Sequence, residues 1–407
     1  MQPLEGIKIL DFTLVLPGMY CTMLLADMGA EVIKVEEAKL RWEPGRLLLP
    51  SLPPEEEPSE DQIKAAYFVE RNKKSIALNL KDEKAREAFY RLAEQADVIV
   101  EGFRPGVTNR LGVDYETIKK VNPRIIYCSI TGYGQDGPYQ DLAGHDGNYQ
   151  AISGVLGLSL TPEGRPFLGN VPMGDLAGGG MQGALGIAFA LIAREKTGKG
   201  QYIDISITDG LFSWLMVSPL VRSYFISGRS LEPGEGLSHF VLQTKDDKYV
   251  LILPVEPWFW ENLCRALDVE EYIPYQKDIL FYKPHGDSKR DEILSRLSQI
   301  FSTKTRDEWF SILWNADTCI SPIYSLEEVL KEPHLIHRRM ITEVSHPTLG
   351  MIKHPGIPIK LSDTPGEIKN VAPLRGQHTR EALLQAGCSK EEIEEMIKKG
   401  TIYCAKL

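Results

Sequence analysis

Two glycine-rich stretches carry the residue types best suited to chemistry in this chain of 407 residues. The stretch AGHDGNYQAISG places His145 in a turn flanked by glycine, and GNVPMGDLAGGG places Asp175 where a glycine-rich helix is expected to begin. An imidazole and a carboxylate presented from two turns can take a proton from one face of a carbon and return it to the other. This pair is the leading candidate for a catalytic site.

Each candidate residue also has a structural interpretation. Asp175 could be the N-cap of its helix, with its carboxylate held by free backbone N–H groups. His145 could be a structural histidine bonded to Asp146. Glu256, in VEPWFW, could be a surface residue at a strand end that Pro257 terminates. Taken singly, these residues leave catalytic and structural roles open.

The segments around these turns alternate between strand and helix patterns. Residues 7–12, 17–28 and 31–36 are predicted as strand, helix and strand, which is typical of a parallel βαβ unit. Further strands are predicted at 75–80, 97–103, 125–130 and 202–207, with Asp82 and Asp209 as helix N-caps. This order predicts a doubly wound α/β sheet. No G-x-G-x-x-G follows the first strand, so the usual dinucleotide fingerprint is missing.

The length of the chain predicts two lobes, each with its own core. We expect a large domain at 1–224, a small α+β domain at 225–335 that begins with a hairpin, and a segment at 336–407 that returns to the large domain. Glycines at 180, 183 and 186 should leave one helix face bare for a neighbouring helix or a ligand. Residues 38–62 are rich in proline and glutamate and are predicted as an exposed loop.

Composition limits the partners and the compartment. A net charge of −10 argues against a nucleic-acid partner. The longest apolar run, at 184–193, has about half the length of a membrane span. Six scattered cysteines indicate neither a zinc site nor a disulfide framework, and Cys319 is better explained as a small hydrophobic residue than as a nucleophile. We therefore expect a cytoplasmic or matrix protein with no metal.

Several motifs spread over nearly the whole chain resemble the family III CoA-transferases, also called the CaiB/BaiF type. These motifs are LADMGAEVIKVE, EGFRPGVTNRLGV, RIIYCSITGYGQDGP, GHDGNY, GDLAGGG, REKTGKGQYIDISITDG and VEPWFW. Within that family the chain most resembles the α-methylacyl-CoA racemases, because GHD-x-NY carries a histidine where transferases commonly have another residue. The phrase QAISG after it is shared with transferases.

The resemblance implies a role for each candidate. In transferases of the family, the residue matching Asp175 attacks an acyl-CoA thioester, whereas in racemases it acts as a base. His145 would be the base for the other face, and Glu256 would orient or charge it. Asp175 is expected to stay ionised at its helix N-terminus, and the N–H groups after it are expected to hold an enolate oxygen.

The resemblance also implies how coenzyme A is held. Arg104 in EGFRPG and the group Arg71, Asn72, Lys73 and Lys74 would contact its phosphates or adenine. Relatives often have arginine where this chain has Glu37, and Arg41 or Arg46 could replace it. No cofactor is expected beyond the coenzyme A of the substrate.

The expected function is therefore inversion at C2 of a 2-methylacyl-CoA. The fold implied is a Rossmann-like large domain with a smaller domain, in an interlocked, ring-like homodimer whose active site is shared between protomers. Acyl transfer between CoA and a free carboxylic acid, through a thioester on Asp175, is the alternative. A CoA-binding protein without catalysis is a third interpretation.

Overall fold

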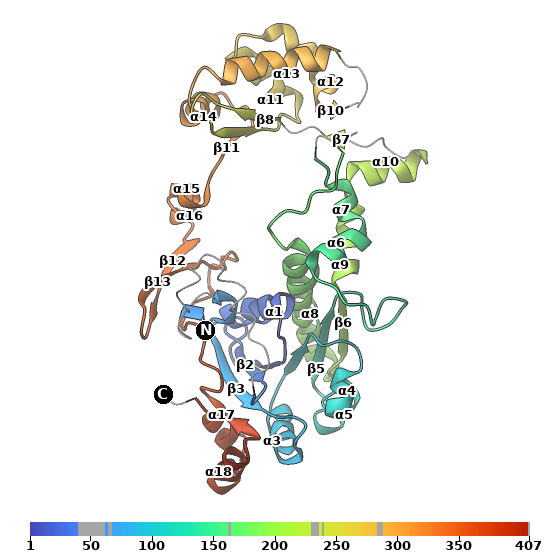
Figure 1. Cartoon of the computed structure of the whole chain (residues 1–407), viewed down its shortest axis with the longest axis vertical. Coiled ribbons are helices and arrows are strands. Elements are labelled where there is room, and N and C mark those ends of the chain that lie inside the picture. The colour runs from blue at the N-terminus through green and yellow to red at the C-terminus, as the bar shows by residue number, and fades with distance from the viewer. Residues whose placement is uncertain are drawn as a thin grey trace. The chain divides into compact units, whose positions relative to one another are not determined.

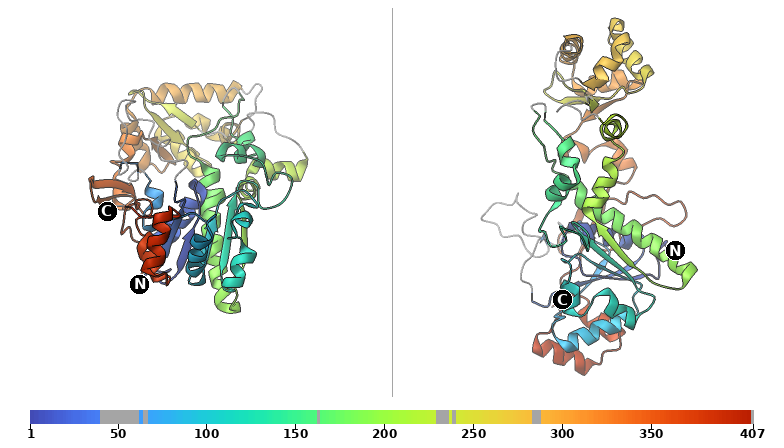
Figure 2. Two further views of the ribbon diagram at one scale, coloured as in Figure 1. Left: turned by 60° about the horizontal axis from the view of Figure 1, so that its bottom comes forward. Right: turned by 90° about the vertical axis from the view of Figure 1, so that its right-hand side faces the viewer.

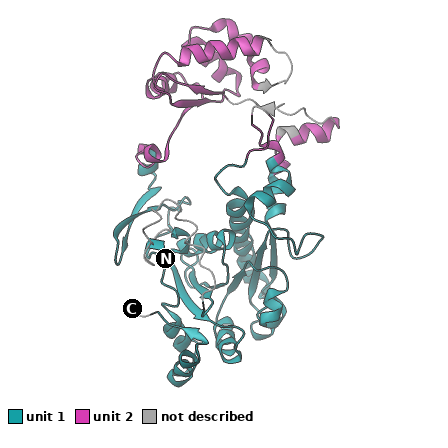
Figure 3. Cartoon of the chain, viewed as in Figure 1, with its two compact units in different colours: residues 1–156, 168–214, 334–407 teal, residues 157–167, 215–333 magenta. Residues whose placement is uncertain are grey.

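The computed structural model describes residues 1–39, 62–63, 67–161, 164–228, 236–237, 240–282 and 288–405. Nearly all of the predicted loop at 38–62, including Arg41 and Arg46, lies outside these residues. The chain divides into two compact units (Figure 3). Unit 1 comprises residues 1–156, 168–214 and 334–407, and unit 2 comprises residues 157–167 and 215–333.

A seven-stranded sheet forms the centre of unit 1, in the order β14-β3-β2-β1-β4-β5-β6 (Figure 1). Its strands are β1 (Lys8–Asp11), β2 (Glu31–Glu36), β3 (Lys73–Leu78), β4 (Val98–Glu101), β5 (Ile126–Thr131), β6 (Tyr202–Ser206) and β14 (Ile402–Tyr403). Strands β1 to β6 pair in parallel, and β14 pairs antiparallel with β3. The predicted α/β class with a mostly parallel sheet is confirmed, but the short edge strand β14 was not predicted.

Helices cover both faces of this sheet (Figure 2). Successive residues of a strand point to opposite faces. Thus Leu10 and Ile33 pack with helices α3 (Glu83–Glu94), α17 (Thr379–Gln385) and α18 (Lys390–Lys399), whereas Ile9 and Val32 pack with α1 (Leu16–Asp27) and α8 (Gln182–Thr197). The remaining short elements of this unit are η2 (Phe68–Glu70), α4 (Val107–Leu111), α5 (Tyr115–Val121) and the hairpin β12 (Ile341–His346) with β13 (Gly350–Pro355).

Of the two predicted helix N-caps, Asp82 is confirmed and Asp209 is wrong. Asp82 caps α3, because its side chain accepts from the Ala85 N–H at 3.1 Å. Asp209 does not cap a helix, because α9 (Ile207–Leu215) already begins at Ile207. The Ser206 hydroxyl accepts from the Asp209 N–H instead, at 3.1 Å. The strand therefore passes directly into the helix at Ser206.

One helix extends well beyond the predicted apolar run. The π-helical segment η3 (Gly174–Met181) continues into α8, and together they form a 24-residue helix, Gly174–Thr197. Among the described residues, this helix alone is long and apolar enough to cross a membrane. Its Ile187 and Ala190 pack in the core with residues of α1 and the sheet, while only 39% of its apolar window is buried.

A buried ionic network anchors β1, β2 and β3 to one another. Lys73 Nζ lies 3.1 Å from Asp11 Oδ2 and 2.8 Å from Glu70 Oε2, and Lys34 Nζ lies 2.7 Å from Glu70 Oε1. Burial raises the pKa of Asp11, but Lys34 and Lys73 outweigh burial and hold that pKa at about 2. The predicted basic residue Lys73 is thus part of the core.

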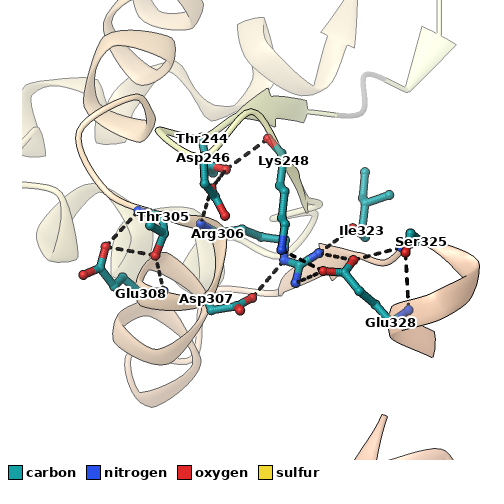
Figure 4. A network of polar contacts seen from close by, with 10 residues as sticks. All are labelled: Thr244, Asp246, Lys248, Thr305, Arg306, Asp307, Glu308, Ile323, Ser325 and Glu328. Carbon is teal, nitrogen blue, oxygen red and sulfur yellow. Dashed lines mark hydrogen bonds and ion pairs between the residues drawn. The ribbon is translucent and has the colours of Figure 1, made fainter. Parts of the chain in front are cut away.

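Unit 2 has a small antiparallel sheet, β11-β9-β8, packed against helices around Trp260. A polar network joins its hairpin turn to two helices (Figure 4). The buried Arg306 donates to both carboxylate oxygens of Glu328, whose Oε1 also accepts from Lys248. Asp246 Oδ1 accepts from the Arg306 N–H.

The remaining helices and strands, in chain order, are α6 (Asp146–Ser153), α7 (Val155–Leu158), α10 (Pro219–Ser227), β7 (Gly236–Leu237), β8 (Phe240–Gln243), β9 (Tyr249–Ile252), α11 (Pro257–Ala266), η4 (Glu270–Tyr275), α12 (Gln276–Leu280), β10 (Phe281–Tyr282), α13 (Ser288–Phe301), α14 (Arg306–Asn315), β11 (Ile320–Ile323), α15 (Leu326–Val329) and α16 (Pro333–His337).

Candidate active site

Asp175 is the second residue of η3 and is partly buried. The residue in the N-cap position is Met173, and its side chain makes no cap hydrogen bond. The backbone N–H of Asp175 instead donates to Asp146 Oδ1 at 3.0 Å. The interpretation of Asp175 as the N-cap of its own helix is therefore wrong, because the side chain that bonds the start of this helix comes from another helix, α6.

Asp146 connects the two candidate catalytic residues. It follows His145 directly, and while its Oδ1 accepts from Asp175, its Oδ2 accepts from Gln150 Nε2. Both carboxylate oxygens are thus occupied by groups other than the His145 imidazole. The structure therefore does not have the alternative arrangement, in which the Asp146 carboxylate bonds the His145 imidazole. Sequence reasoning missed Asp146 as the link, although it stands inside the GHDGNY motif.

The environment of Asp175 favours its neutral form. Burial raises the pKa of Asp175 from 3.8 to about 7, and the charge of Asp146 adds to the rise. None of the basic residues that the structure describes offsets this effect. The expectation that the helix dipole keeps Asp175 fully ionised is therefore wrong, because desolvation outweighs the dipole. A carboxyl group poised near neutral pH can both accept and donate a proton.

His145 stands in the N-cap position of α6 and is exposed. Its backbone N–H donates to Asn148 Oδ1 at 3.0 Å, which fixes the start of the helix and the direction of the turn. The imidazole is thereby presented at the surface of unit 1, one residue from the carboxylate that bonds Asp175. Through Asp146 the structure links the turn that carries His145 to the start of the helix that carries Asp175, and the catalytic roles of both residues stay a prediction.

Tyr149 is influenced by the charges of both Asp175 and Arg104. The pKa of Tyr149 is raised to about 12, chiefly by burial and then by the charge of Asp175, while Arg104 lowers it. The Tyr149 hydroxyl donates to the carbonyl of Gly144, next to His145. Arg104 is exposed just after β4, and its charge reaches Tyr149.

Glycines allow the helix that carries Asp175 to pack closely. A Cβ on Gly180 would lie 2.8 Å from the carbonyl oxygen of Pro17, and one on Gly183 would lie 2.7 Å from Ile130 Cδ1. A Cβ on Gly178 would lie 2.9 Å from the carbonyl oxygen of Ile207. The predicted bare face at 180, 183 and 186 thus contacts α1, β5 and β6, and Gly178 adds a contact with α9. The N–H groups of Asp175 and Leu176 are occupied by Asp146 and the Pro172 carbonyl, so neither is open to an enolate oxygen here.

A pocket of about 750 Å³ lies at the carboxyl ends of the parallel strands. It is lined by residues that follow β1, β2, β3 and β4, among them Phe12, Ala38, Leu80 and Phe103, and by Arg110 of α4. We call it the carboxyl-edge pocket. Ligands of open parallel sheets bind at this edge. Its basic residues are Lys39, Lys81, Arg110 and Lys399.

A comparison with protein families assigns the chain. The model of "CoA-transferase family III" matches residues 4–379. The chain belongs to CoA-transferase family III.

Characterised relatives of this family member catalyse two kinds of reaction. Human succinyl-CoA:glutarate CoA-transferase is 33% identical, over 99% of this chain and 90% of the relative. Formyl-CoA:oxalate CoA-transferase of Bradyrhizobium sp. (strain ORS 278) is 33% identical, over 98% and 97%. Human alpha-methylacyl-CoA racemase is 31% identical, over 97% and 96%. Identity alone therefore does not separate transferase from racemase.

A solved structure supports the family assignment. The CAIB/BAIF family protein from Brucella suis superposes with a TM-score of 0.77 at 27% identity, over 95% of this chain and 99% of the other. The mixed α/β architecture is thus shared with the CaiB/BaiF type.

The CoA contacts predicted for this family member do not lie together. Arg104 follows β4 at the carboxyl edge, whereas Arg71, Asn72 and Lys74 stand at the start of β3, at the amino edge. Arg71 is 1% exposed and binds Asp27 through two nitrogens. Asn72 uses its side chain to bond Asp27 and residues 367–370. Arg71 and Asn72 thus stabilise the fold, and of the predicted set Arg104 is the residue whose charge acts on Tyr149.

Glu256 lies in unit 2, in the N-cap position of α11 with Pro257 after it. It is partly exposed, and its side chain makes no cap hydrogen bond. Its carboxylate is therefore not consumed in capping this helix. The pairing of Glu256 with His145 stays a prediction.

Proposed function

We propose that this member of CoA-transferase family III inverts the configuration at C2 of a 2-methylacyl-CoA. The observation that carries the proposal is the carboxyl group of Asp175, which is poised near neutral pH, linked through Asp146 to a turn that presents a histidine. Asp175 must be ionised both to attack a thioester and to remove an α-proton, but inversion also uses its protonated form to return a proton to the enolate, and a pKa near the working pH makes both forms available. The environment of Asp175 thus favours proton transfer.

The two directions of inversion use the pair in opposite states. Ionised Asp175 removes the α-proton from one face, the thioester becomes an enolate, and protonated His145 delivers a proton to the other face. The reverse direction starts with neutral His145 and protonated Asp175. Glu256 assists by orienting His145 and favouring its charged form.

We place the coenzyme A of the substrate in the carboxyl-edge pocket. The pocket reaches Phe103, whose neighbour Arg104 acts electrostatically on Tyr149 beside Asp175. Lys81 and Arg110 supply cations for the phosphates. This location replaces the predicted contacts of Arg71, Asn72 and Lys74.

A second copy of the chain is proposed to complete the site. In unit 1, four apolar side chains at helical spacing are exposed on one face of the helix that carries Asp175: Met181, Leu185, Phe189 and Ile192. Their fractional exposure runs from 48% to 62%. A contiguous apolar stripe of this kind marks an interaction surface. A homodimer that covers this stripe could deliver Glu256 from one protomer to His145 of the other.

The test is incubation with a single enantiomer of a 2-methylacyl-CoA in heavy water, without an acceptor acid. We expect the α-proton signal to disappear from the NMR spectrum together with optical purity. His145→Ala should abolish this exchange. Retention of the proton, together with an acyl-enzyme at Asp175 that hydroxylamine traps, would show that the proposal is wrong.

The second candidate is acyl transfer, favoured by the two CoA-transferase relatives at 33% identity. Here ionised Asp175 attacks the thioester carbonyl and the CoA thiolate leaves; the thiolate then attacks the aspartyl carbonyl of the anhydride, which releases the donor acid and forms an aspartyl-CoA thioester. The acceptor carboxylate attacks this thioester, the CoA thiolate leaves again, and its attack on the acceptor carbonyl of the new anhydride forms the product thioester and frees Asp175. Asp175→Asn abolishes both reactions and does not discriminate. His145→Ala does, because transfer should survive it largely intact.

A further inference from the structure

A second pocket, of about 440 Å³, lies at the amino ends of β2 and β3. Its walls are the strand starts at 31–32 and 72–74, the hairpin turn at 345–348, the segment 369–374 and residues 377–378, all in unit 1. We call it the amino-edge pocket. It opens at the opposite edge of the sheet from the carboxyl-edge pocket, and a six-residue strand separates the two edges by about 20 Å. It is therefore not part of the site described above.

His346 lines this pocket and is only 6% exposed. Its Nδ1 accepts from the backbone N–H groups of Thr348 and Leu349, each at 3.3 Å. A neutral imidazole whose Nδ1 accepts carries its hydrogen on Nε2. Within the described part of the chain, no residue bonds that Nε2. His346 therefore offers the pocket a donor.

His378 repeats this arrangement on another wall. Its Nδ1 accepts from the Ser75 N–H at 3.1 Å. Burial lowers the pKa of His378, so the ring is neutral at pH 7 and its Nε2 also carries a hydrogen. Among the described residues, none bonds this Nε2 either. The adjacent Gln377 has its amide oxygen occupied by the Leu374 N–H at 2.8 Å, which leaves its NH₂ group as a donor.

The charged residues of the lining do not cancel this donor character. The carboxylate of Glu31 is held by Lys74 Nζ at 2.8 Å, and Lys74 also lies 3.5 Å from Glu381. These carboxylates raise the pKa of Lys74 despite its burial, so the ammonium stays charged. Lys369 adds a second, exposed ammonium to the rim; its Nζ donates to Gln2 Oε1 and lies 3.9 Å from Glu367 Oε2.

We infer that the amino-edge pocket binds a small metabolite through a carboxylate or phosphate group. Three side chains from two segments, 345–348 and 377–378, have their acceptor atoms bound to backbone N–H groups and present donors only, with an ammonium beside them. A ligand group rich in acceptors satisfies such a lining, and a pocket of this volume is in the range that holds a small molecule.

The experiment uses the full chain with ¹⁵N-labelled histidine, titrated in parallel with inorganic phosphate and with succinate. We expect saturable shifts of the His346 and His378 ring signals with at least one of the two anions, and no shift of exposed His337. Saturation with phosphate alone assigns a phosphorylated ligand, and saturation with succinate alone assigns a carboxylate. Absence of saturable shifts with both anions up to tens of millimolar would overturn the inference.

Two variants separate binding from folding. In His346→Asn and His378→Asn the amide oxygen keeps the acceptor for the backbone N–H, and only the Nε2–H donor is lost. Each should weaken anion binding about tenfold, since one hydrogen bond to a charged group is removed. His337→Asn is the matched control and should bind like the wild type. Equal affinity of all three variants and the wild type would also overturn the inference, whatever the outcome of the racemase test.

Discussion

The carboxyl groups of Asp175 and Asp146 have different tasks because of where their oxygens point. Asp146 is held by two hydrogen bonds, from the Asp175 N–H and from Gln150. Asp175 is buried beside that negative charge, and burial is the larger cause of its raised pKa. Asp146 thus positions Asp175, and the carboxyl group of Asp175 is poised to exchange a proton.

The pH dependence of α-proton exchange should report this arrangement. Removal of the proton by Asp175 requires its ionised form, so the rate of that step should rise with pH around 7. Asp146→Asn keeps an oxygen for the Asp175 N–H but removes the charge, so it should shift the midpoint to lower pH. Burial remains, so the midpoint should stay above the ordinary 3.8. The measurement is exchange in heavy water from pH 5 to 9.

Asp141→Asn, an exposed change in the same loop, is the matched control for this shift. An unchanged midpoint in Asp146→Asn would mean that Asp146 does not influence the titration of Asp175. A midpoint shifted equally by both variants would point to a general effect of charge.

At the scale of the element, glycines let the helix 174–197 pack closely against its neighbours, and ion pairs hold the strand β1 in position. The helix approaches α1 so closely that Gly180 faces the carbonyl of Pro17, and this contact sets the position of Asp175. At β1, Asp11 is fully buried and depends on Lys34 and Lys73 for its ionised state. The contact of Gly180 with Pro17 and the ion pairs of Asp11 both lie near the carboxyl ends of the parallel strands and stabilise that edge of the sheet.

Gly180→Ala should destabilise unit 1 by about 1–3 kcal/mol, because its Cβ would meet backbone that cannot move aside. Gly186→Ala on the same helix is the control. There the nearest atom is a side-chain methyl of Ile203 at 3.3 Å, and the higher helix propensity of alanine offsets the contact. Urea unfolding measures both. Gly180→Ala with stability at or above the wild type would contradict the packing argument.

Asp11→Asn should cost about 3–5 kcal/mol at pH 7, because it leaves buried lysines with one partner fewer. The pKa of Asp11 is depressed, so the stability it provides is present above 3.8 and is lost as pH falls through 3.8 toward 2. The loss of stability over that range should be smaller in the variant. An identical slope of unfolding free energy against pH in both proteins would rule out this role.

At the scale of the whole molecule, the exposed apolar stripe on α8 predicts association. Phe189 is 62% exposed, so replacing it disturbs little within one chain. Phe189→Glu should convert a dimer into a monomer and lower the exchange rate, because Glu256 of a second copy would no longer reach His145. Analytical ultracentrifugation measures the mass. Lys196→Glu, an exposed change in the last turn of the same helix, should leave the dimer intact. A wild-type protein that is fully active as a single chain would refute the shared site.

The sequence by itself determined the local features of this protein, and only the tertiary structure decided how they combine. Periodicity and capping chemistry are properties of neighbouring residues, so the strands, most helices and the Asp82 cap could be predicted, and the GHDGNY and GDLAGGG motifs indicated the family. The link from Asp146 to Asp175, the burial that raises the pKa of Asp175 and the core positions of Arg71 and Lys73 depend on contacts between distant segments. A basic stretch at the start of β3 looks the same in sequence whether its side chains meet a phosphate or a buried carboxylate. In the folded chain these basic side chains pair with buried carboxylates, because a charge enclosed by a sheet and a helix is stable only with a partner of opposite sign.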